Sequence, residues 1–153
     1  MIVIGAGAAG MMCAATAGQR GRSVWLLDHA KKIGEKIRIS GGGKCNFTNI
    51  HARPETFLSN NPHFCKSALK QYTQNDFIDL VEKHGITYHE KENNLGQLFC
   101  DGSSRQIIDM MLDECESAGV MLSKEISVES VEKCEKGGYH LETSQGPASC
   151  ESL

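Results

Sequence analysis

The chain has 153 residues, of which 40% are hydrophobic and 23% charged, and its formal net charge is −3. This length suits one globular domain, no apolar run approaches the roughly 20 residues of a membrane span, and the charge gives no reason to expect a nucleic acid or a lipid surface as the main partner. Met1 enters an apolar run directly, without a signal-type leader, so we expect a cytoplasmic protein. The seven cysteines have no C-x-x-C spacing, so neither a disulfide framework nor a metal site is expected.

The first predicted element is a strand, a tight turn and a helix. The β-branched residues 2–4 run into glycines spaced G-x-G-x-x-G over residues 5–10. In this pattern the first glycine allows the turn, the second leaves room for a pyrophosphate, and the third lets the helix lie close on its strand. A second apolar run, residues 24–27, ends at Asp28, whose carboxylate can accept both ribose hydroxyls of an adenosine. Residues 1–28 therefore predict a β-α-β unit that binds an adenine dinucleotide, and a plain glycine turn is the alternative.

Residues 29–50 predict a basic, glycine-rich loop rather than another crossover helix. The three glycines 41–43 are not a Walker loop, because Arg38 and Cys45 stand where that motif needs glycine and serine or threonine. The N–H groups of these glycines can face phosphate or ring oxygens, and nearby lysines supply positive charge. A mobile surface loop with solvated lysines is the alternative.

The rest of the chain is expected to alternate helices and short strands. Two helices carry a start signal, Asn61 before Pro62 and Thr73 with Asp76 in capping-box spacing. The predicted elements are helices at 62–72 and from Thr73 to Gly85, strands at 86–90 and 97–100 around a turn at 93–96, a helix from Ser103 or Ser104 to Gly119, and a β-hairpin of 125–134 and 139–143 followed by a strand at 148–153.

Two motifs resemble a known family. The pairing of IVIGAGAAGMMCA with KKIGEKIRISGGGKCNFTN is similar to the HI0933-like (BaiN/YhiN-like) family of FAD-dependent, NAD(P)H-linked oxidoreductases, whose signature is K-x-G-x-K followed by S-G-G-G-(R/K)-C-N-x-T-N. The resemblance implies an α/β, Rossmann-like (glutathione-reductase-type) FAD-binding fold with a β-meander. We expect a partial FAD/NAD(P)-binding domain over 1–153, truncated before the family's final strand and substrate domain. Its expected parts are the β-α-β unit 1–28, the loop 29–50, a helical/α+β part 62–118 and a hairpin or meander 120–153.

The same resemblance implies, position by position, which residues would bind FAD. These are Gly5, Gly7, Ala8, Ala9 and Gly10 at the pyrophosphate, Asp28 at the adenosine ribose with His29 beside it, Lys36, Ser40, Gly41, Gly42, Gly43, Lys44, Cys45 and Asn46 along the flavin half, and Val128, whose backbone would hold the adenine edge. Disulfide reductases of this superfamily carry a C-x-x-x-x-C pair, but Ile50 stands at the second position, so no dithiol relay is expected. Cys45 is expected to pack beside the cofactor, and the alternative is a thiol whose pKa cationic neighbours lower.

These observations predict the FAD-binding module of a flavin-dependent oxidoreductase. NAD(P)H is the expected electron donor, and the resemblance implies reduction of an electron-poor C=C bond, in a small molecule such as a steroid-like enone or in a uracil ring of ribosomal RNA. The charge does not indicate RNA, no membrane partner is expected, and no residue pair qualifies as catalytic acid and base. A nicotinamide-only Rossmann dehydrogenase and a non-catalytic truncated remnant stay open as alternatives. We expect the chain alone, as a fragment of a larger flavoenzyme, to be inactive and prone to association.

Overall fold

A computed structural model describes residues 1–92 and 95–153, and the chain divides into two compact units. Unit 1 consists of Met1–Lys36 and Met111–Leu153, and unit 2 of Ile37–Met110. The two boundaries fall within the helices α2 (Glu35–Ile39) and α5 (Ser104–Ser117). Unit 1 is therefore assembled from two stretches that are distant in sequence, whereas unit 2 is continuous.

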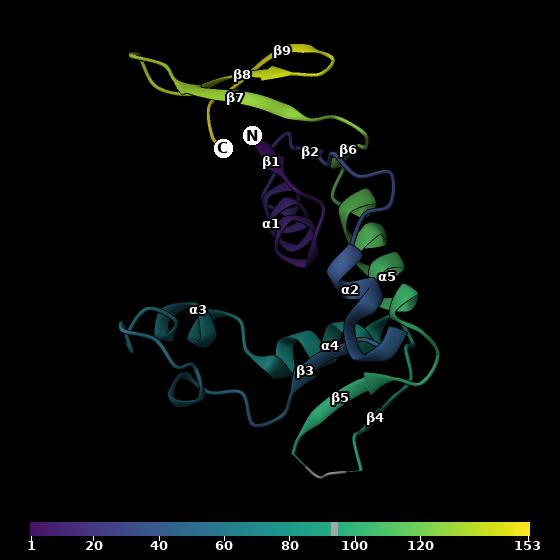
Figure 1. Cartoon of the computed structure of the whole chain (residues 1–153). Helices are drawn as coiled ribbons and strands as arrows, with labels where there is room; N and C mark the ends of the chain where they lie inside the picture. Colours follow the sequence, from purple (N-terminus) through teal and green to yellow (C-terminus); the bar gives the residue numbers. More distant parts are fainter. Residues whose placement is uncertain (93–94) are drawn as a thin grey trace. The chain divides into compact units, whose positions relative to one another are not determined.

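Unit 1 contains a parallel sheet of the Rossmann type (Figure 1). Its strands lie in the order β1–β2–β6, with bounds Ile2–Ile4, Trp25–Leu27 and Met121–Ser123. Helix α1 (Ala8–Gln19) connects β1 to β2, as the glycine spacing predicts. Leu26 and Leu27 are fully buried, which explains why β2 reads as a continuous apolar run rather than an alternating one.

A three-stranded antiparallel meander packs on this sheet. Its strands are β7 (Val128–Lys133), β8 (Tyr139–Thr143) and β9 (Gly146–Cys150), in that order. Ile2 and Leu27 of the parallel sheet form one buried cluster with Ile126 and Leu141. The N–H group of Ile2 donates to the carbonyl of Ser152 at 3.0 Å, so the two chain ends lie next to each other, as Figure 1 shows. The predicted hairpin is present, and the strand expected after it begins two residues earlier.

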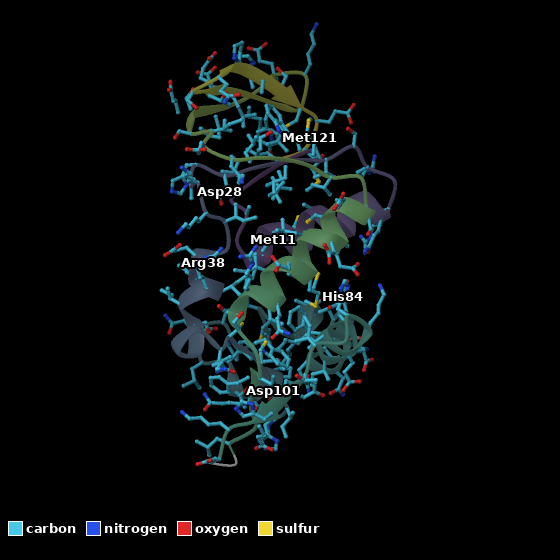
Figure 2. The ribbon with its side chains drawn as sticks, turned by 90° about the vertical axis from the view of Figure 1, so that its right-hand side faces the viewer. Met11, Asp28, Arg38, His84, Asp101 and Met121 are labelled. Atoms are coloured by element: carbon cyan, nitrogen blue, oxygen red, sulfur yellow. The ribbon has the colours of Figure 1, made fainter. Side chains whose placement is uncertain are left out.

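Helices α1 and α5 pack closely within unit 1. A Cβ atom at Gly18 would lie 2.5 Å from the carbonyl oxygen of Ala118, so only glycine allows this approach without a shift. The Cys115 thiol donates to the Met11 carbonyl at 3.3 Å, and Figure 2 places Met11 on α1 beside α5. The parallel sheet thus packs against the meander, and α1 packs against α5.

Unit 2 is a small α+β structure. Its antiparallel sheet has the order β3–β5–β4, and its elements are 3₁₀ turns at Ser40–Gly43 and Pro54–Thr56, strands β3 (Asn46–Asn49), β4 (Tyr88–Glu90) and β5 (Gln97–Cys100), and helices α3 (Lys66–Gln71) and α4 (Gln74–Lys83). The ring of Phe47 in β3 packs edge-on against Tyr88, with centroids 5.4 Å apart, and 6.1 Å from Phe77 of α4. These aromatic contacts join the sheet to α4.

Of the two helices predicted for unit 2, one is confirmed and the other is shorter than expected. Helix α4 is confirmed with its capping box, because Thr73 Oγ1 accepts the N–H of Asp76 and the Asp76 carboxylate accepts the N–H of Thr73. The helix expected from Pro62 begins only at Lys66, because the Asn61 side chain accepts the N–H of His63 and forms a turn instead. The turn expected at 93–96 begins at residues 93 and 94, which lie outside the described residues. None of the helices in the described part of the chain combines the length and apolarity needed to cross a bilayer.

Candidate functional site

The glycine turn of unit 1 has three positions with different surroundings. Gly5 has a φ of +100°, and its N–H donates to the carbonyl of Leu27 at 2.7 Å. A Cβ atom at Gly10 would overlap the carbonyl oxygen of Gly5, which explains how α1 lies so close to the turn. A Cβ atom at Gly7 would meet no atom within 4 Å. The first glycine therefore allows the turn and the third allows close packing of the helix, whereas the second faces the open space that a pyrophosphate requires.

The N-terminus of α1 is open to an anion. The helix begins at Ala8 with Gly7 as N-cap, no side chain caps it, and its first turn holds no acidic residue. Ala8 and Ala9 are exposed. Because the first N–H groups of a helix have no intrahelical partner and carry the positive end of its dipole, this end favours a phosphate.

Asp28 holds the turn in place from the end of β2. Its carboxylate is buried, with the residue 9% exposed; Oδ2 accepts the N–H of Ala6 at 2.6 Å and Oδ1 that of Ala30 at 2.8 Å. A carboxylate has about four acceptor positions, so two remain for ribose hydroxyls. The neighbouring His29 side chain is 81% exposed, with Nδ1 3.6 Å from Oδ1 of Asp28. Asp28 (Figure 2) is thus both a structural anchor and an acceptor with spare capacity.

Val128 presents its backbone at the edge of the meander. It lies opposite Thr143, and the N–H of Ser144 donates to the carbonyl of Ser127 at 2.9 Å. In an antiparallel ladder this pattern makes Val128 a non-hydrogen-bonded position, whose own N–H and C=O point away from the partner strand. The N–H of Ile126 donates to the carbonyl of Asp28 at 3.0 Å, so β7 starts beside the end of β2. Unit 1 therefore gathers the glycine turn, Asp28 and an outward-facing backbone edge.

The second glycine loop belongs to unit 2. Gly41, Gly42 and Gly43 have φ values of +57°, +64° and +88°, a backbone that side chains rarely adopt. A Cβ atom at Gly41 would lie 2.6 Å from the ring of Phe99, whereas Gly42 and Gly43 face open space. Packing alone thus requires the first glycine, and the other two leave an unobstructed backbone for a ligand.

The polar residues in and next to this loop differ in whether their hydrogen-bonding groups already have partners. The ammonium of Lys44 donates to the carbonyls of Asp101 and Gly102 at 2.7 and 2.8 Å, so it ties the loop to the end of β5. Asn46 Oδ1 is buried and has no hydrogen-bond partner among the described residues. A buried acceptor of this kind fits the N–H donor of a bound ligand. Ser40 accepts the N–H of Cys45 through its carbonyl at 3.0 Å, and Lys36 on α2 is exposed.

Cys45 is a packing residue rather than an activated thiol. Its side chain is buried and its φ is +55°. Burial, and to a lesser degree the neighbouring thiol of Cys100, raises the pKa of Cys45 to about 11. The alternative in which cationic neighbours lower this pKa is wrong, because burial disfavours the charged thiolate.

The family model described as "HI0933-like protein Rossmann domain" matches residues 1–153. The chain belongs to the HI0933-like family. The 3-ketosteroid-delta4-(5alpha)-dehydrogenase from Rhodococcus jostii RHA1 has the same fold, with a TM-score of 0.65 and 13% identity over 99% of this chain and 43% of its own. The predicted Rossmann-like fold of the FAD-binding type with a β-meander is confirmed, and the chain is the Rossmann domain of an HI0933-like protein.

Two relatives are much closer in sequence. The Ribosomal RNA dihydrouridine synthase of Escherichia coli is 57% identical over 99% of this chain and 37% of its own length. The protein of the same name from Haemophilus influenzae is 51% identical over 99% of this chain and 38% of its own length. The chain thus spans less than two fifths of the length of these HI0933-like relatives.

These names contradict the expectation of a small-molecule substrate. The net charge gave no indication of RNA. The net charge of −3 hides a strong segregation of charge along the chain. Residues 29–72 hold eight Lys or Arg and two Glu, a net charge of +6, whereas residues 73–153 hold six basic and sixteen acidic residues, a net charge of −10. The basic character of residues 29–50 is evident from the sequence, but the expectation about RNA rests on the charge of the whole chain, which a count by segment does not support.

Proposed function

We propose that the protein carrying this chain is an FAD-dependent oxidoreductase that reduces a uracil ring in ribosomal RNA. The observation that carries this proposal is the 57% identity, over 99% of the chain, with a ribosomal RNA dihydrouridine synthase. A dihydrouridine forms when a hydride and a proton add across one C=C bond of the base, which is the electron-poor double bond that the family resemblance implies.

In this proposal unit 1 binds the ADP half of FAD. The pyrophosphate would face the N–H groups of Gly7, Ala8, Ala9 and Gly10, with Gly5 shaping the turn, because this backbone is open and lies at a helix N-terminus. Asp28 would accept the ribose hydroxyls with its two remaining acceptor positions, and the exposed His29 would stand beside them. The outward N–H and C=O of Val128 would pair with the adenine edge.

We assign the flavin half to the loop of unit 2. Gly42 and Gly43 would offer their open backbone, and the buried Oδ1 of Asn46 would gain the donor that it lacks. Lys36 would contribute charge, while Ser40, Gly41, Lys44 and Cys45 would hold the loop in shape. When bound, FAD supplies hydride transfer between a reduced nicotinamide, NADH or NADPH, and the base. Residues 1–153 would then serve as one FAD-binding domain, and the cytoplasm is the expected site of action because ribosomal RNA is the substrate.

The test is complementation. The full-length protein that carries this chain is expressed in bacteria that lack their own ribosomal RNA dihydrouridine synthase, and dihydrouridine in the purified, digested ribosomal RNA is measured by mass spectrometry. We expect the wild-type protein to restore dihydrouridine and the Gly7→Val variant, whose side chain would fill the pyrophosphate space, to purify without FAD and restore none. A wild-type protein that is expressed, contains FAD and leaves the uridines unreduced would refute the proposal.

A further inference from the structure

Residues 51–72 of unit 2, which we call the aromatic–basic segment, expose more apolar surface than a solvated loop needs. Leu58 is 96% exposed, Phe64 83% and Phe57 47%. Soluble proteins rarely leave neighbouring large apolar side chains uncovered unless a ligand or partner binds there. In Figure 1 the segment leaves β3, passes through α3 and returns to α4.

The backbone of the segment is held by its own hydrogen bonds. The N–H of Thr56 donates to the carbonyl of Arg53 at 2.9 Å, that of Phe57 to Pro54 at 3.2 Å, and that of Phe64 to Asn61 at 3.1 Å. These hydrogen bonds form turns on either side of Leu58, so the exposed apolar side chains are presented from a defined backbone.

Positive charge accompanies the exposed rings. The segment contains Arg53, Lys66 and Lys70 but only one carboxylate, Glu55, so its net charge is +2 in a chain whose net charge is −3. Lys66 and Lys70 are exposed on α3, and neither forms an ion pair with any residue that the structure describes. A hollow of about 570 Å³, within the roughly 300–1,000 Å³ of small-ligand sites, is lined by Phe57, Leu58 and Lys66 and also by Glu55.

We propose that the aromatic–basic segment binds an unpaired stretch of ribosomal RNA, with bases stacked on Phe64 and Phe57 and phosphates at Lys66 and Lys70. This inference rests on the proposed function. Aromatic rings stack on any unpaired base, and lysines beside them neutralise the backbone, which is how proteins hold single-stranded RNA. The net charge of +2 favours RNA, because every nucleotide that stacks on a ring also brings a phosphate of opposite charge to the lysines.

The test uses the full-length FAD-containing protein and a fluorescein-labelled oligouridine as the probe, with binding followed by anisotropy at several salt concentrations. The double variant Lys66→Gln, Lys70→Gln should make the slope of log K against log salt shallower by about 1.4, since each single-strand phosphate contact contributes about 0.7. Between 1 M and 0.1 M salt, the double variant should therefore gain about 25-fold less affinity than the wild type. Phe64→Leu should weaken binding by about 5- to 150-fold, whereas Phe64→Trp should keep the wild-type affinity, because only a ring can stack. Lys136→Gln, in the exposed β7–β8 turn of unit 1, is the matched control and should change neither quantity.

Two results would overturn the inference. One is unchanged oligouridine binding by the Phe64→Leu and lysine variants of a protein that does form dihydrouridine in cells. The other is a Phe64→Leu protein that loses FAD or thermal stability but keeps its oligouridine affinity per folded molecule. This result would show that another part of the protein covers the segment. Failure of the wild-type protein to form dihydrouridine is a different result: it refutes the proposed function, and this inference falls with it.

Discussion

Gly7 and Gly10 lie three residues apart, and changing each to alanine should have opposite effects. Gly10→Ala should lower stability, whereas Gly7→Ala should lower FAD retention. At Gly10 the new methyl would overlap the carbonyl oxygen of Gly5, and since that atom is backbone the turn itself must move. Overpacking costs typically ~1–3 kcal/mol and here belongs at the upper end, while the better helix propensity of alanine returns only ~1 kcal/mol. The net loss of about 2 kcal/mol corresponds to a fall in Tm of roughly 4–8 °C.

At Gly7 the same methyl would enter open space, and the N-cap backbone there, with φ −87° and ψ −174°, accepts any residue. The poorer N-cap propensity of alanine and its lower unfolded-state entropy oppose each other, each at ~0.5–1 kcal/mol, so the cofactor-free protein should keep its Tm within about 2 °C. FAD retention should nevertheless fall, because the methyl occupies the pyrophosphate space.

The assay is thermal unfolding of both variants with and without FAD, together with the ratio of flavin to protein absorbance after purification. A Gly10→Ala protein as stable as wild type would show that α1 does not lie on the turn as described. A Gly7→Ala protein that retains FAD fully, together with a Gly7→Val protein that does the same, would refute the assignment of the pyrophosphate to this turn.

Three further predictions concern Asp28 and the loop of unit 2. Asp28→Ala should lower the free energy of unfolding by about 2–3 kcal/mol even without FAD, measured by urea denaturation, because two backbone N–H groups lose their acceptor; a loss below 0.5 kcal/mol would contradict the anchoring role. Cys45 should react with iodoacetamide far more slowly than the exposed Cys13 at pH 8, because a pKa of about 11 leaves only ~10⁻³ of the Cys45 thiol ionised. The rate of Cys45 should rise about tenfold per pH unit towards pH 11. Equal rates for the two cysteines in a mass-spectrometric time course would refute this. Gly41→Ala should lower Tm, and Phe99→Ala should relieve part of that loss in the double variant, because the added methyl meets the ring; strict additivity would show that the contact is absent.

Local patterns predicted the elements whose cause is local. The turn at Gly5–Gly10, the capping box of Thr73 and Asp76 and the periodic helix α5 all depend on residues a few positions apart. Strand β3 depends on a partner far away in sequence: Thr48 pairs with Leu98, and nothing in the run N-F-T-N alternates clearly enough to predict a strand. The start of α3 was predicted four residues too early because an asparagine before a proline forms a turn as readily as a helix cap.

The sequence predicted those parts of the candidate site that depend on backbone conformation. Glycine positions and the carboxylate after β2 follow from motif spacing, and unit 1 brings Asp28 and the turn together as the spacing requires. The roles of Lys44 and Cys45 depend on what surrounds them in three dimensions: two carbonyls occupy the ammonium, and burial raises the pKa of the thiol. The small-molecule expectation, which the relatives' names contradict, has a different origin. The resemblance left an enone and a uracil ring open, and a single net charge, which averages a basic segment with an acidic one, did not point to RNA.

The division of unit 1 between two distant stretches has a consequence during translation. Strand β2 pairs with β6, and Ile2 bonds to Ser152, so the nucleotide-binding half cannot close until nearly all 153 residues have left the ribosome. At about 5–20 residues per second the first two strands wait roughly 6–25 s with their apolar faces uncovered. By contrast, all three strands of the sheet in the continuous unit 2 are synthesised by residue 110. The nascent chain should therefore gain protease resistance first in its middle, and its N-terminal strands should be the part that needs a chaperone.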